Sequence, residues 1–80
     1  MEHRNRIPVR NGGVADLVVV VEPWASEIRL APGAECEVVL IGNARWPSHS
    51  VELCPYGLIF FAKEGTDAHE IWQGGQPQIW

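Results

Sequence analysis

Hydrophobic and polar residues alternate with a period of two along much of the chain, most clearly just before the Glu-Pro-Trp motif. Successive side chains of a β-strand point to opposite faces, so Leu17, Val19 and Val21 share one face of this segment. The opposite face has valines in its middle and acidic residues at its ends. Because β-branched side chains are stiff at χ1, the run of valines favours a strand over a helix. The pattern predicts a long central strand over residues 14–22.

Shorter alternating segments follow, and turn residues separate them. Asn11-Gly12-Gly13 predicts a tight hairpin between the first two strands, because asparagine and glycine accept the positive φ that such turns require. Pro32-Gly33 is a second strong turn signal. The predicted strands span residues 6–10, 14–22, 27–30, 34–41, 49–53, 58–63 and 69–73.

About seven short strands with closely spaced turns, and no segment of helical period, predict an all-β fold. We expect a small antiparallel β-sandwich or a partly open barrel. Eighty residues are enough for one domain. The prediction is a single β-domain over residues 1–73 with a short basic N-terminal arm, followed by a Gly/Gln-rich C-terminal tail over residues 74–80.

The charge of the chain limits its partners. A net charge of −4 argues against binding to nucleic acid or to an anionic membrane surface. Arg4, Arg6 and Arg10 lie close together near the start, and we expect them to form a solvated, partly frayed arm. No apolar segment suits a signal peptide or a membrane span. Two cysteines are too few for a disulfide framework and fit a reducing compartment, so the sequence predicts a cytoplasmic protein.

Alternation also predicts which side chains form the core. Trp24 directly follows the longest strand and is the best core candidate among the tryptophans. In the later strands, alternation predicts that the following side chains face the core: Cys36, Val38, Leu40, Val51, Leu53 and Ile71.

A set of apolar residues falls on the opposite side from this core. A soluble monomer rarely leaves an apolar patch of more than a few hundred Å² exposed to water. We therefore predict an interface, with a homodimer or a larger protein as partner and no enzymatic activity. The alternatives are that the sheet curls into a barrel or that the tail folds back over the patch. The predicted interface residues are Val18, Val20, Val39, Ile41, Phe61 and Trp72.

Tryptophans suggest a second function. Trp46 follows Arg45 in the longest irregular connection, and Trp72 has the opposite parity to Ile71. Exposed tryptophans can stack on sugar rings or pack against a protein. Trp46, Trp72 and Arg45 are thus an alternative site for a carbohydrate or another small ligand.

Metal binding and catalysis have weaker signals. His49, Cys54 and His69 are suitable ligand types for zinc or copper, but their spacing matches no metal motif. Ser48 and His49 are adjacent, and neighbours on a strand point to opposite faces, so they do not suggest a nucleophile and its base. We expect no cofactor and no catalytic residue.

Several short motifs follow one another in a recognisable order. An apolar strand ends in Glu22-Pro23-Trp24, a Leu-x-Pro-Gly turn ends at Pro32-Gly33, and Glu37-Val38-Val39 comes next. In this order they resemble a set of small uncharacterised bacterial all-β proteins, over residues 6–63. The resemblance implies a compact β-domain, and it implies no activity, cofactor or catalytic residue.

Overall fold

The structure is a computed structural model, and it describes residues 2–43, 45 and 49–78. Each predicted strand overlaps an observed one, and the described residues include no helix that could cross a lipid bilayer. The strands are β1 (His3–Arg10), β2 (Leu17–Glu22), β3 (Ser26–Leu30), β4 (Glu35–Gly42), β5 (His49–Cys54), β6 (Gly57–Ala62), β7 (Ala68–Gln73) and β8 (Gln76–Pro77).

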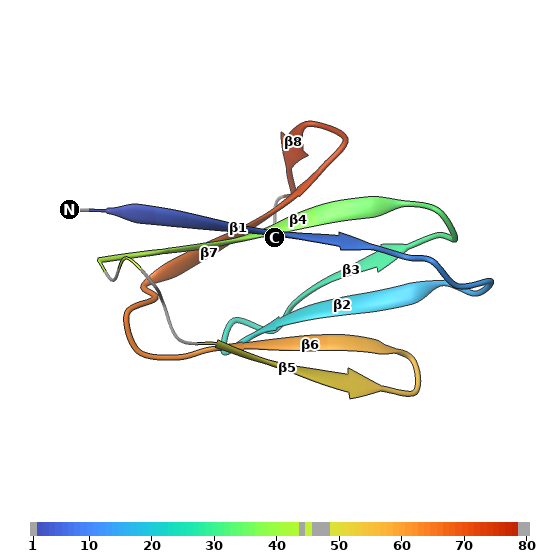
Figure 1. Ribbon diagram of the computed structural model, residues 1–80, viewed down its shortest axis with the longest axis horizontal. Helices are drawn as coiled ribbons and strands as arrows, with labels where there is room; N and C mark the ends of the chain where they lie inside the picture. The colour runs from blue at the N-terminus through green and yellow to red at the C-terminus, as the bar shows by residue number, and fades with distance from the viewer. Residues whose placement is uncertain (1, 44, 46–48, 79–80) are drawn as a thin grey trace.

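The strands form two sheets of four, which confirms the all-β fold (Figure 1). We call the sheet with order β1-β4-β7-β8 sheet A and the sheet with order β3-β2-β6-β5 sheet B. All neighbours are antiparallel except β2 and β6, which run parallel. The chain crosses to sheet A at β4 and returns to sheet B at β5. Strand β6 then pairs with β5 antiparallel and with β2 parallel.

The predicted hairpin at Asn11 is wrong. β1 pairs with β4 and β2 pairs with β3 and β6, so the first two strands belong to different sheets. Asn11 is instead a buried residue that ties the two layers together. Its Nδ2 donates hydrogen bonds to the carbonyls of Ala15 (2.8 Å) and Leu30 (2.9 Å), and its Oδ1 accepts one from the Gly13 N–H (2.9 Å).

The core lies between the sheets, at the positions that alternation predicted. Its residues come from both layers, and Trp24 packs against it as expected. Cys36 is buried in this core, where burial raises the pKa of its thiol to about 11. The buried cluster consists of Val9, Val19, Val21, Leu30, Cys36, Val38, Leu40, Phe60 and Ile71.

Val51 and Leu53 of β5 differ from the prediction. They pair with Phe60 and Leu58 of β6, so their side chains point to the core face of sheet B as expected. Yet Val51 is 49% exposed and Leu53 is 80% exposed. Strand β5 is an edge strand of sheet B (Figure 1), and Val51 and Leu53 are not part of the cluster that the sheets enclose. The predicted direction of these two side chains is confirmed, but the prediction that they are buried is wrong.

The described residues of the predicted arm and tail include strands. The basic arm is part of β1, and Arg4 and Arg6 form ion pairs with Glu70 and Glu37. The tail begins with the short strand β8, which pairs with β7. The Gln78 N–H then donates to the Ile71 carbonyl (2.8 Å). Residues 76–78 of the tail therefore fold back beside β7 of sheet A.

Candidate functional site

The predicted interface residues are divided between the outer faces of the two sheets. Val18, Val20 and Phe61 lie on the outer face of sheet B, where β2 and β6 are neighbours. Val20 pairs with Ile59, which the prediction omitted although it shares the parity of Phe61. Val18 is buried there, and the other three side chains are half-buried. This outer face is therefore a modest apolar stripe.

Val39 and Ile41 are on the outer face of sheet A, but they are not exposed. Val39 is 0% exposed, although it points away from the core. The Arg4 guanidinium on β1 binds the Glu70 carboxylate on β7, and these two strands flank β4, so the ion pair spans it. Long arginine side chains can cover apolar surface with their methylene stems while the charged end stays in water. The expectation of an exposed patch at Val39 and Ile41 was wrong: both are buried, and long polar side chains flank them in register, with Arg6 and Arg4 opposite them on β1 and Glu70 opposite Val39 on β7.

Strand β5 carries the largest exposed apolar side chains in any described strand. Val51 and Leu53 are joined by Tyr56, which is 59% exposed in the turn between β5 and β6. Among the described strands, β5 also has a neighbour on one side only, so half of its backbone groups have no partner strand there. We call the unpaired side of β5 with Val51 and Leu53 the β5 edge. Alternation placed both side chains inward, and a single sequence holds no signal for where the opposite sheet ends.

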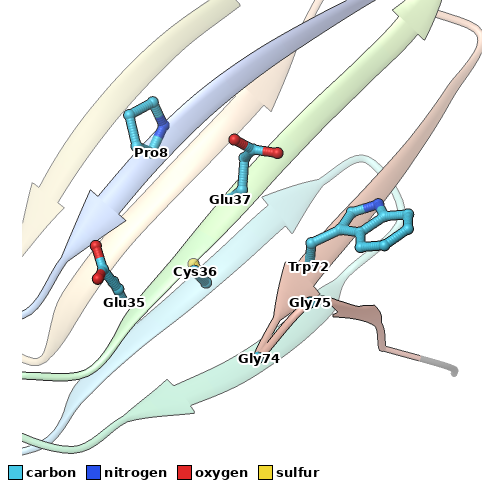
Figure 2. A pocket seen from close by; sticks show the side chains of 7 residues that line it. All are labelled: Pro8, Glu35, Cys36, Glu37, Trp72, Gly74 and Gly75. Atoms are coloured by element: carbon cyan, nitrogen blue, oxygen red, sulfur yellow. The ribbon is translucent and has the colours of Figure 1, made fainter.

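Trp72 borders a shallow hollow of about 280 Å³ on the outer face of sheet A (Figure 2). Pro8, Glu37 and Trp72 are in register across β1, β4 and β7. The indole N–H of Trp72 donates to Glu70 (2.9 Å), and Arg6 donates to Glu37 (2.7 Å). The hollow thus combines one aromatic ring with carboxylates. It is lined by Pro8, Glu35, Cys36, Glu37, Trp72, Gly74 and Gly75.

The other residues of the predicted ligand site do not add to this hollow. Arg45 is exposed in the connection between β4 and β5 and does not line it. Trp46 lies outside the described residues, so its contribution stays a prediction. The candidate ligand surface that the structure supplies is therefore Trp72 with Pro8, Glu35 and Glu37.

His69 has a structural environment between the sheets. Its Nε2 is 2.6 Å from the Ser26 hydroxyl, and its ring stacks on Trp24 with centroids 4.3 Å apart. Burial lowers the pKa of the imidazole, and the neighbouring Glu70 carboxylate partly opposes this shift. Ser26 is only 4% exposed, so a substrate cannot reach its hydroxyl in this closed arrangement. We interpret the contact as a link between β3 and β7.

The three proposed metal ligands lie apart. His49 and Cys54 are at opposite ends of β5, which separates them by roughly 17 Å at 3.3–3.4 Å per residue. His69 is in the other sheet, paired with Leu40. Within the described ranges, no group of three histidine, cysteine or acidic residues could hold a metal ion. The predicted cluster of His49, Cys54 and His69 does not form in this structure.

Comparisons with protein-family models, with curated proteins and with solved structures gave no match to this chain. The resemblance to small bacterial β-domains therefore stays a prediction. The function has to be inferred from the surfaces just described.

Proposed function

We propose that this chain is a non-enzymatic protein-interaction domain that associates with itself. One observation carries the proposal: the side chains of Val51 and Leu53 face the core side of sheet B but remain largely exposed. Fully burying a valine or leucine side chain is worth about 1.5–3 kcal/mol. An 80-residue domain has a total stability of only about 4–12 kcal/mol, so leaving these side chains in water is costly.

The surroundings of these side chains favour a protein partner over a small ligand. They belong to an edge strand, and neither the Trp72 hollow nor the hollow lined by Ile41 and Asp67 includes them. A flat apolar strip beside unpaired backbone donors and acceptors is suited to another polypeptide, which can supply both apolar contacts and hydrogen bonds. The outer stripe of Val20, Ile59 and Phe61, on β2 and β6, is a second apolar surface of sheet B and a competing contact site.

The solution mass tests the proposal. We expect light scattering over a concentration series to show a species of about twice the monomer mass of 8.9 kDa. A double Val51→Asp, Leu53→Asp variant should stay folded and become monomeric, whereas Val20→Asp tests the outer stripe in the same assay. Val14→Asp is the matched control, since Val14 is 99% exposed in the loop before β2. A monomer at every concentration would refute self-association.

A second candidate function is ligand binding at the Trp72 hollow. A sugar could stack on the indole ring while its hydroxyls donate to Glu35 and Glu37, which line the same hollow. Such a ligand should quench the fluorescence of the wild type, and Trp72→Phe should reduce the response because the ring and its contacts change. A flat titration across a panel of glycans would exclude this candidate.

The cellular setting is part of the proposal. Cys36 and Cys54 form no disulfide, which fits the reducing bacterial cytoplasm that the sequence analysis favours. In that setting the partner is a protein, most directly a second copy of the chain, and neither a nucleic acid nor a membrane. The acidic net charge of −4 supports this choice.

A further inference from the structure

The edges of the two sheets are protected to different degrees. Strand edges present unpaired backbone groups, and proteins usually block them with proline, with charges or by keeping them short. β1 contains Pro8 and several arginines, β3 has Glu27 and Arg29 among its five residues, and β8 has two residues including Pro77. β5 has six residues, no proline, and Glu52 as its single acidic or basic residue apart from a histidine. Among the edges formed by the described strands, β5 is the unprotected one.

The turn between β5 and β6 fixes which backbone groups of β5 point to the edge. Cys54 pairs with Gly57 across a two-residue turn, so this is the closing pair, and it exchanges hydrogen bonds in hairpins of this kind. Hydrogen-bonded and non-hydrogen-bonded pairs alternate along an antiparallel ladder. The N–H and C=O groups of Leu53, Val51 and His49 therefore point away from β6, toward the unpaired side.

We propose that a second copy of the chain adds to this edge, antiparallel, with the two Val51 residues facing each other across a two-fold axis. The proposal rests on the self-association argued above and specifies its geometry. In this register Val51 meets its symmetry mate and His49 meets Leu53 of the other copy. The backbone N–H and C=O groups of His49, Val51 and Leu53, which point to the unpaired side of β5, would then form about six hydrogen bonds with the same groups of the other copy.

Charge and strand length exclude the neighbouring registers. An axis through Glu52 would place two carboxylates directly opposite each other in a close, non-hydrogen-bonded pair, which is unfavourable. An axis through Ser50 would move Leu53 past the partner's strand, which begins at His49. With the axis at Val51, Glu52 faces Ser50 of the other copy, and no like charges meet.

This register also accounts for the exposed side chains. Residues that pair in an antiparallel ladder share a face, so the core faces of both B sheets lie on the same side of the joined sheet. The two four-stranded B sheets become one continuous sheet of eight strands. Val51 and Leu53 of both copies then gather at its centre, between the two A sheets, where they contact one another.

Cross-linking tests the register directly. Val51→Cys, made with Cys54→Ser, should give a covalent dimer with a short bismaleimide, because the two sulfurs are opposite each other at the axis. Cys36 is buried and should not compete. Val14→Cys in the same background is the control, because Val14 is 99% exposed in the loop before β2 and is not part of the β5 edge. Equal cross-linking of the two variants would overturn the register.

A charge at the axis gives the second test. Val51→Lys places two ammonium groups opposite each other and should raise the dissociation constant of the dimer about tenfold or more, while Val14→Lys leaves it unchanged. Circular dichroism should show that both variants are folded. A dimer that survives Val51→Lys and gives no Val51→Cys cross-link would refute the β5 edge and leave self-association through another surface. A wild type that is monomeric throughout would refute self-association itself.

Discussion

Asn11 should be the most sensitive polar side chain of the fold. Asn11→Ala removes three hydrogen bonds at once, to the carbonyls of Ala15 and Leu30 and from the N–H of Gly13. The bond to Leu30 is buried, so its carbonyl would lose its partner away from water. Such an unpaired group costs about 1–3 kcal/mol, and each of the two part-buried bonds contributes about 0.5–1 kcal/mol. We expect a loss of about 2–5 kcal/mol.

This loss is a large fraction of the stability of the domain, which is about 4–12 kcal/mol for 80 residues. Urea unfolding followed by tryptophan fluorescence should therefore show a midpoint lowered by about 2 M or more, at a slope of about 1 kcal/mol per M. Asn43→Ala is the control, because Asn43 is exposed, and its effect should stay within about 0.5 kcal/mol. A loss of stability below about 1 kcal/mol for Asn11→Ala would refute the role assigned to the Asn11 hydrogen bonds.

Asn11→Asp separates hydrogen bonding from shape. The carboxylate can still accept from Gly13, but it cannot donate to the carbonyls of Ala15 and Leu30. Facing two carbonyl oxygens in a buried site raises the pKa of the introduced carboxyl in the folded state above its unfolded value of about 3.9. The folded state then holds its proton more tightly, so the variant should regain stability as the pH falls through the folded pKa. A stability difference from wild type that is independent of pH would contradict this reasoning.

Three further stability measurements test other features. Gly57→Ala would place its Cβ 1.9 Å from a backbone oxygen of β2 and should cost at least about 2 kcal/mol, whereas Gly12→Ala, with its nearest atom at 3.8 Å, should cost far less. Val39→Ala should cost about 2 kcal/mol because the side chain is fully covered, and the same change at Val51 should have little effect on a monomer. Because burial lowers the pKa of His69, its contribution is complete above about pH 6.5 and declines as the pH falls below that value. His69→Gln should remove this part of the pH dependence of urea unfolding.

The strands and the inward faces could be predicted because side-chain period two is a local property. Val19, Val38 and Ile71 each lie in an alternating segment, and each is fully buried. Strand pairing could not be predicted in the same way. Asn11-Gly12-Gly13 has the composition of a hairpin turn, but the Asn11 side chain donates to Leu30, nineteen residues away. A tertiary hydrogen bond overrode the local turn signal.

The candidate sites were only partly predictable. The outward direction of Val39 and Trp72 followed from parity, and both point away from the core. The burial of Val39 depends on strands far away in the sequence, since its register partners are Arg6 on β1 and Glu70 on β7. The exposure of Leu53 depended on the extent of the opposite sheet, which no local pattern encodes.

The contrast between Val39 and Leu53 shows why strand position decides which apolar side chains remain available for contact. β4 has a neighbour on each side, so long side chains from β1 and β7 can meet above it and cover Val39. β5 has β6 on one side and an unpaired edge on the other, so the same kind of cover cannot form across it from both sides. A group that buries Leu53 therefore has to lie on the unpaired side of β5. A second β5 strand brings it from that direction together with the backbone partners that the edge lacks, which is why we place the interface there and not on the outer face of sheet A.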